Sequence, residues 1–116
     1  MKLLLSASLF GAIATGGNLA QACNITPQRL IGSWVCVSSA CEFQEMRFER
    51  EGNKLKFSSW LHQRPEIVNA SWSLKQCQLQ IKHQTLGREF RVVKLDGKQL
   101  WLTTKHSPEI AIYERL

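Results

Sequence analysis

Apolar and polar residues alternate along most of the chain after residue 32. In the segment 78–82, Leu79 and Ile81 alternate with glutamine and lysine, and Phe57 follows the same pattern beside Lys54 and Lys56. An alternation of period two is typical of a β-strand that buries one face and exposes the other. We therefore predict eight strands, over residues 33–38, 42–50, 54–62, 66–74, 77–83, 88–95, 98–105 and 109–115.

Short segments rich in turn-forming residues separate the predicted strands. The dipeptide Asp96-Gly97 predicts a tight hairpin, because it suits the type I′ turn in which both central residues have positive φ. Ahead of the first strand, Thr26 is a suitable N-cap and Pro27 a suitable first helical residue. Residues 27–31 are therefore predicted to form one short helical turn.

The strand pattern predicts a closed barrel. Strands with one polar and one apolar face, joined by short connections, favour antiparallel pairing over a βαβ arrangement. Eight short strands in so small a chain suggest an up-and-down barrel, which leaves no exposed sheet edge. The fold class is thus predicted as all-β, an antiparallel up-and-down eight-stranded barrel, with a two-sheet sandwich as the alternative.

The same alternation predicts which side chains face the barrel interior. Val68 is expected to share its face with Ala70, Trp72 and Leu74. On the last two strands, Leu100 and Leu102 are expected to pair with Ile110 and Ile112. The predicted inward residues are Trp34, Met46, Phe48, Phe57, Val68, Trp72, Leu79, Ile81, Leu100 and Ile112.

Residues 1–22 have the features of a secretory signal peptide. Lys2 precedes an apolar run over 3–14, and Ala20-Gln21-Ala22 gives the small-x-small cleavage pattern. The apolar run is too short to cross about 30 Å of hydrocarbon. Residues 23–116 are then one exported domain, periplasmic or secreted. A lipid anchor on Cys23 is less favoured, because it would leave an odd thiol in an oxidising compartment.

The cysteines predict two disulfides. Cys23, Cys36, Cys41 and Cys77 are an even number in a small exported domain, and four cysteines allow three connectivities. A hairpin loop over 37–40 would place Cys36 opposite Cys41, which leaves Cys23 to pair with Cys77. The longer of these loops contributes about 4 kcal/mol by chain entropy and the shorter about 2 kcal/mol. Zinc-site spacing is absent, so no metal site is predicted.

Several motifs resemble those of lipocalins and of small exported bacterial lipocalin-like domains. Leu30-Ile31-Gly32-Ser33-Trp34 is similar to their Leu-x-Gly-x-Trp motif, and Tyr113-Glu114-Arg115 is similar to their closing Tyr-x-Arg. The resemblance implies an eight-stranded meander barrel. It also implies a structural role for Gly32 and a packing contact between Trp34 and Arg115 at the closed end, with cation–π character.

An eight-stranded barrel has an interior that side chains fill or that holds one small ligand. Both alternatives stay open for the predicted inward aromatic residues. Small residues near one mouth leave room for a shallow pocket. The candidate ligand-binding residues are Trp34, Phe57, Ser59, Ala70 and Trp72. The sequence therefore suggests an exported, lipocalin-like binding protein for a small apolar or anionic ligand of the cell envelope.

Charge sharpens the choice of partner. The chain has 15 basic and 9 acidic residues, a net charge of +6, which favours anionic counterparts. Export argues against nucleic acid and leaves anionic lipids, lipopolysaccharide or an acidic protein. The alternative function is a periplasmic inhibitor or immunity-type protein that uses the barrel rim and two exposed tryptophans, Trp60 and Trp101, as anchors. A monomer that is not integral to the membrane is expected.

No catalytic signature is present in the sequence. The three histidines, His62, His83 and His106, are far apart and match no metalloenzyme motif. Nucleophile motifs and glycine-rich phosphate loops are absent. The carboxylates Glu45, Glu49 and Glu51 alternate with arginines, which suggests a solvated charge ladder. We expect neither an enzyme nor a cofactor.

Overall fold

Strands account for most of the protein. The computed structural model describes residues 23–116, and the predicted signal peptide lies outside them. The only helix among the described residues is a 3₁₀ turn of four residues, far too short to cross a bilayer. The elements are η1 (Pro27–Leu30), β2 (Gly32–Cys36), β3 (Glu45–Glu51), β4 (Lys54–Leu61), β5 (Arg64–Lys75), β6 (Gln78–His83), β7 (Leu86–Leu95), β8 (Gln99–Thr104) and β9 (Ser107–Arg115).

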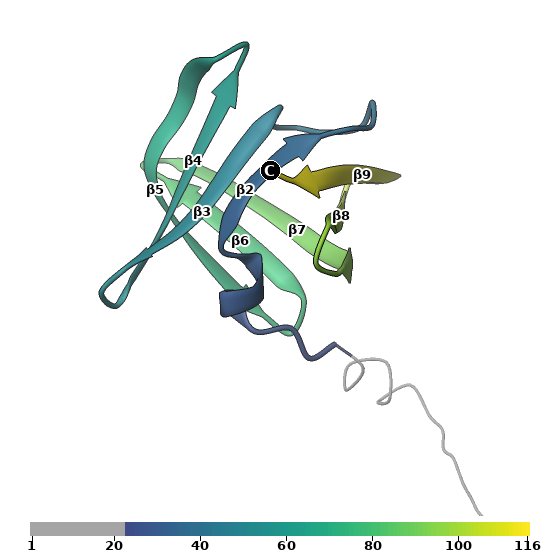
Figure 1. Ribbon diagram of the computed structural model, residues 1–116, viewed down its shortest axis with the longest axis horizontal. Helices are drawn as coiled ribbons and strands as arrows, with labels where there is room; N and C mark the ends of the chain where they lie inside the picture. Colours follow the sequence, from purple (N-terminus) through teal and green to yellow (C-terminus); the bar gives the residue numbers. More distant parts are fainter. Residues whose placement is uncertain (1–22) are drawn as a thin grey trace, which may run out of the picture.

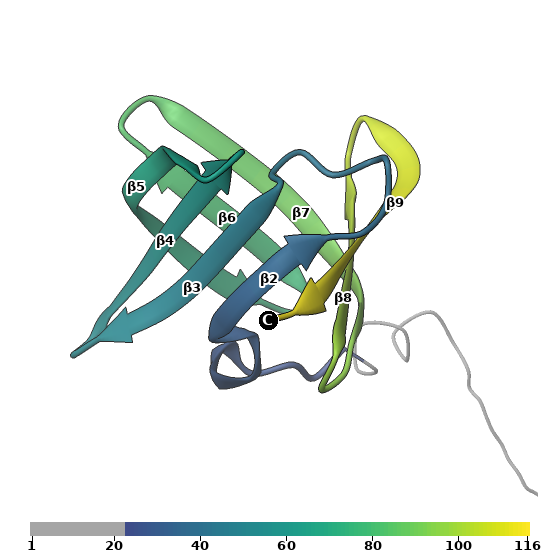
Figure 2. The same ribbon diagram turned by 45° about the horizontal axis from the view of Figure 1, so that its top comes forward.

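The eight strands form a closed antiparallel barrel (Figures 1 and 2). Each strand pairs with the next in the chain, and β2 pairs with β9 to close the circle. This confirms the up-and-down barrel and excludes the sandwich. One end carries η1 and the turns after β3, β5 and β7; we call it the η1 end. The opposite end carries the long β2–β3 loop, and we call it the Phe43 end.

A bulge in β5 corrects the predicted inward face of that strand. Phe57 pairs with Ala70 and Ser59 pairs with Ile67, so two residues of β5 lie opposite the single residue between them on β4. The extra residue, Asn69, has a φ of 58°. A bulge shifts the alternation by one position. The prediction for Val68 is therefore wrong: Val68 is 47% exposed, and Ile67 takes the interior position.

The predicted inward face of β9 is also wrong. Leu100 pairs with Tyr113 and Leu102 with Ala111, and both partners are buried. Ile110 is exposed, and Ile112 lies on the outer face opposite Trp101. All four residues 110–113 are apolar or aromatic, so alternation alone does not distinguish the two phases. The Tyr113 phenol enters the interior because a backbone partner satisfies its hydroxyl.

Both ends of the barrel are closed by residues from outside the strands. Leu30 of η1 is fully buried at one end, and the Trp34 indole Nε1 donates a hydrogen bond to its carbonyl at 3.0 Å. Phe43, from the β2–β3 loop, is 3% exposed at the other end. Burying one large side chain of this kind stabilises the fold by about 1.5–3 kcal/mol. These two residues complete the hydrophobic core.

Both predicted disulfides are present. Cys23–Cys77, with Cα atoms 5.8 Å apart, ties the start of the described chain to the turn between β5 and β6. Cys36–Cys41, with Cα atoms 6.1 Å apart, closes the β2–β3 loop at the Phe43 end. The two bridges therefore brace opposite ends of the barrel. They are consistent with an oxidising, exported location.

The tight turns differ from the prediction. Asp96 and Gly97 do not have positive φ, so their turn is not type I′. Instead, the Asp96 carboxylate accepts hydrogen bonds from the amides of Lys98 and Gln99, both at 2.8 Å. Left-handed pairs occur at His62-Gln63, with φ of 53° and 65°, and at Gln76-Cys77, with φ of 51° and 66°. Neither of these pairs contains the glycine or asparagine that such turns favour.

Candidate functional site

The five candidate ligand-binding residues all lie in the hydrophobic core. Trp34, Phe57, Ser59, Ala70 and Trp72 are each at most 4% exposed. Trp34 lies at the η1 end, where it bonds to Leu30. The Ser59 hydroxyl lies 3.5 Å from a carboxylate oxygen of Glu66 on β5. The structure brings Phe57 and Trp72 into one aromatic cluster and places Trp34 apart from them.

Aromatic side chains form a continuous column through the interior. The ring centroids of Phe43 and Phe57 lie 5.3 Å apart, those of Phe57 and Phe48 lie 5.2 Å apart, and those of Phe48 and Trp72 lie 5.1 Å apart. Phe90 adds a fourth contact, 6.1 Å from Phe43. Tilted and edge-to-face pairs at these distances are the favoured aromatic geometries. The column packs the middle of the barrel with side chains.

Several interactions hold Phe43 in the mouth of the barrel. The Tyr113 hydroxyl donates to the Phe43 carbonyl at 2.9 Å and accepts from the Phe43 amide at 3.3 Å. Burial raises the pKa of Tyr113, so the phenol stays protonated and keeps its donor. Glu42 forms an ion pair with Arg88 on β7, and Cys36–Cys41 closes the loop just before it. The β2–β3 loop is therefore a tethered plug.

A hollow of about 450 Å³ lies on the outer surface between β4 and β5, beside the bulge. Its walls include Leu55 and edges of Ala70 and Trp72, two of the predicted ligand residues, and its rim includes Lys54 and Lys56. The Lys56 ammonium is paired with Glu51 at 2.6 Å, which leaves the Lys54 ammonium beside Leu55 to attract a small anionic molecule.

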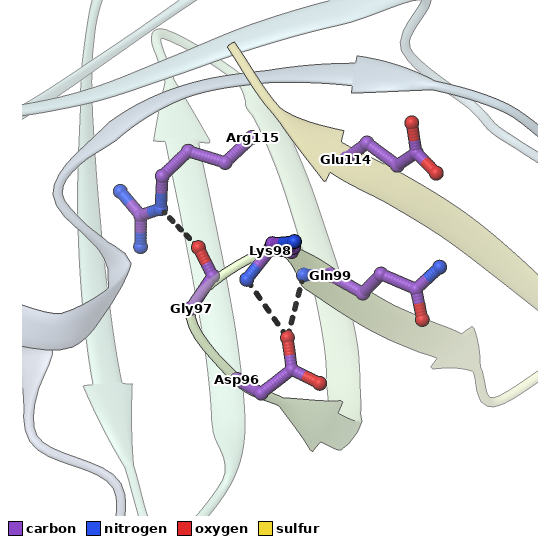
Figure 3. Close-up of a pocket in the computed structure, with 6 residues that line it drawn as sticks. All are labelled: Asp96, Gly97, Lys98, Gln99, Glu114 and Arg115. Atoms are coloured by element: carbon purple, nitrogen blue, oxygen red, sulfur yellow. Dashed lines mark hydrogen bonds between the residues drawn. The ribbon is translucent and has the colours of Figure 1, made fainter.

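A hollow of about 730 Å³ lies at the η1 end, and hydrogen bonds join several of the residues that line it (Figure 3). In the β7–β8 turn, the Asp96 carboxylate accepts hydrogen bonds from the backbone amides of Lys98 and Gln99. These two hydrogen bonds hold the pKa of Asp96 below its usual range. Arg115 donates to the carbonyls of Gly97, Arg29 and Ile31. This hollow is therefore lined by groups that hold the fold together.

The three structural residues suggested by the family resemblance are in contact. The Arg115 guanidinium carbon lies 4.2 Å from the centre of the Trp34 ring. Gly32 has a φ of +135°, and a Cβ there would lie only 2.5 Å from Arg115 Nη1. The positive φ favours glycine, and the Arg115 guanidinium would have to shift to admit a side chain at this position.

The two candidate interface tryptophans lie on opposite sides of the barrel. Trp60 is on β4 and Trp101 on β8, four strands apart in either direction around the eight-stranded circle. Arg47 stacks over Trp60 at 5.1 Å, and Lys94 stacks over Trp101 at 4.7 Å. The sequence missed these two cations because they come from neighbouring strands and only the register reveals them. A single flat surface cannot contact both tryptophans.

Within residues 23–116, no group of three or more histidine, cysteine or acidic side chains is placed to hold a metal ion. His62, His83 and His106 lie near the turns of the Phe43 end. In the expected charge ladder, Glu51 pairs with Lys56 at 2.6 Å, and this bond lowers the pKa of Glu51.

Comparison of the chain with models of protein families, with curated proteins and with solved structures found no match.

Proposed function

We propose that this protein is an exported, non-catalytic binding protein of the cell envelope that recognises a protein partner with the outside of its barrel. The observation that carries the proposal is the filled interior. Leu30 and Phe43 close the two ends, and the aromatic column lies between them. Because buried apolar and aromatic side chains pack the core, we assign recognition to the outer surface. This is the inhibitor or immunity-type hypothesis.

The chemistry of the surface supports a binding role. The Tyr113 hydroxyl is buried and anchors the Phe43 backbone. All four cysteines are in disulfides. Tryptophan and arginine are enriched among the anchors of protein interfaces, and Arg47 stacks over a partly exposed Trp60. These groups favour recognition over catalysis.

A second candidate function is binding of a small anionic or apolar molecule, as the sequence first suggested. The observation that favours it is the hollow between β4 and β5, where Trp72 and Leu55 lie beside Lys54 and Lys56. This site lies outside the barrel and needs no movement of the Phe43 plug. It would accept a molecule with one apolar ring and one acidic group.

The test of the proposed function is reconstitution of a complex. A partner captured from an envelope extract is identified, purified and titrated against the protein. We expect a 1:1 complex that Trp60→Ala weakens by about tenfold or more, as for an interface anchor. Val68→Ala, a change of a 47% exposed residue on the neighbouring strand, is the matched control. A complex indifferent to surface substitutions, or a protein that retains a small molecule instead, would contradict the proposal.

A further inference from the structure

A basic surface with an apolar centre lies on β5, β7 and β8 near the η1 end. The register aligns Lys75, Gln78 and Arg91 in one row across three strands. Next to this row, Lys94 pairs with Trp101. We call the residues Lys75, Arg91, Val93, Lys94 and Trp101 the basic patch.

Positive charge in the basic patch is largely uncompensated. Among the described residues, no carboxylate lies within 4.0 Å of Lys75 or Arg91, and the nearest approach to Lys94 is Asp96 at 3.8 Å. Glu89, an acidic residue of the same sheet face, is already bonded to Lys105 and Gln80, both at 2.8 Å. The patch therefore presents a net positive potential to any approaching surface.

A second bulge supplies the apolar centre. The register shifts between Val92 and Lys94, so Val93 and Lys94 are both exposed although they are consecutive. Val93 is 50% exposed, and Trp101 beside it is partly exposed beneath the Lys94 ammonium. The Trp101 indole N–H already donates to Gln99 at 3.2 Å. What remains to contact a partner is apolar surface surrounded by cations.

A small hollow adjoins the basic patch. It has a volume of about 170 Å³ and is lined by Arg91, Gln78 and Thr103, together with Glu89 and the Lys105 that is bonded to it. The Glu89 carboxylate makes this hollow unsuited to a phosphate group. The attraction of the patch for an anionic surface therefore comes from Lys75, Arg91 and Lys94 on the open sheet face.

We propose that the basic patch docks the protein on the anionic phospholipid surface of an envelope membrane. Basic residues near such a surface are each attracted by about 1 kcal/mol, and tryptophan favours the membrane–water interface. The proposal rests on export but not on a protein partner. Trp60, on the opposite side of the barrel, would then face away from the lipid and stay free for the partner.

The test uses the purified exported protein and vesicles. Binding is measured to vesicles of phosphatidylcholine and phosphatidylglycerol in equal parts, with pure phosphatidylcholine vesicles for comparison. We expect binding only to the anionic vesicles, weakening as salt rises. Lys75→Ala/Arg91→Ala should weaken it by about tenfold or more. Arg50→Ala/Arg64→Ala removes the same charge from exposed residues of β3 and β5 outside the patch and should change it by less than about threefold.

Tryptophan fluorescence gives an independent readout of orientation. A blue shift on vesicle binding should persist in Trp60→Phe and disappear in Trp101→Phe. If removal of charge has altered the fold, Lys75→Gln/Arg91→Gln gives the same comparison with the length and polarity of the side chains largely kept. Three results would overturn the proposal. The two charge variants would lose vesicle binding equally, the blue shift would disappear in Trp60→Phe, or the protein would not bind anionic vesicles. Because the vesicles contain no protein, their failure leaves the proposed protein partner untouched.

Discussion

Arg115 joins three parts of the fold through one side chain. Its guanidinium donates to carbonyls of η1, of Ile31 and of the β7–β8 turn, and it stacks on Trp34. Gly32 makes room for it because a Cβ there would meet Nη1 at 2.5 Å. The contact closes the η1 end of the barrel, so the residue pair suggested by a family motif has a physical role in this chain.

Gly32→Ala tests this closure. The new methyl group meets the Arg115 guanidinium, and the φ of +135° is strained for alanine, so we expect a loss of about 2–3 kcal/mol in the free energy of unfolding. Gly87→Ala, where no atom lies within 4 Å of the new Cβ, is the control and should change stability little. Denaturant unfolding measures both variants. Equal stability of the two would contradict the role assigned to Gly32.

Tyr113→Phe tests the anchor of the plug. The substitution leaves the buried amide and carbonyl of Phe43 without their hydroxyl partner, which costs about 1–3 kcal/mol. The pKa of the phenol is raised in the folded protein, so folding favours its protonated form. That part of the stability is complete below the ordinary tyrosine pKa of about 10 and is lost as pH rises above it.

Alkaline unfolding curves of wild type and Tyr113→Phe separate this effect from other titrations. The stability difference between the two proteins should shrink steadily above about pH 10. A difference that stays constant to higher pH would show that the phenol is not held protonated by burial.

At the scale of elements, alternation predicts the strands, and the number and spacing of the cysteines predict both disulfides. Alternation fails where the sheet has bulges or where both faces of a strand are apolar. A single asparagine at position 69 is not enough to predict the β5 bulge from the sequence. The sequence prediction therefore places Val68 on the wrong face of the strand. In β9, four consecutive nonpolar residues leave the phase undetermined, and the bond from Tyr113 to a distant loop decides it. The pairs of Arg47 with Trp60 and Lys94 with Trp101 depend on register and are invisible to composition.

The His62-Gln63 turn is a testable weak element. Both residues have positive φ, which asparagine and glycine tolerate better. His62→Asn/Gln63→Gly should therefore raise the free energy of unfolding by about 1 kcal/mol. Asp96→Asn, which also gives an asparagine–glycine turn, is the contrast. It should not raise the free energy of unfolding, because the Asp96 carboxylate accepts hydrogen bonds from two amides and its φ is not positive. Thermal melting distinguishes the outcomes.

The two disulfides should contribute unequally. Cys23–Cys77 closes a sequence separation of 54 residues and Cys36–Cys41 one of 5 residues. By chain entropy, Cys23→Ser/Cys77→Ser should cost about 4 kcal/mol and Cys36→Ser/Cys41→Ser about 2 kcal/mol. Hydrogen exchange should separate the two variants locally. Only Cys36→Ser/Cys41→Ser should lose protection of the Phe43 amide from exchange. Loss of that protection in the first variant alone would contradict the tethered plug.

At the scale of the whole molecule, the barrel has a filled interior, braced ends and a surface whose charge is unevenly distributed. The sequence left open whether the inward aromatic residues are core or ligand site. The column from Phe43 to Trp72 favours core. The aromatic column could not be predicted from the sequence, because Phe43 lies in a loop and the sequence predicts a strand over 42–50. Because Trp60 and Trp101 lie on opposite sides of the barrel, the two proposed recognition faces are separate.

Native mass spectrometry of the protein purified from an exporting host tests the central claim, that recognition is external and the interior is filled. The account predicts the mass of the polypeptide with two disulfides and no bound small molecule. A small molecule retained at one per chain and released when Phe57 is replaced by Trp would place a ligand inside the barrel and contradict the account.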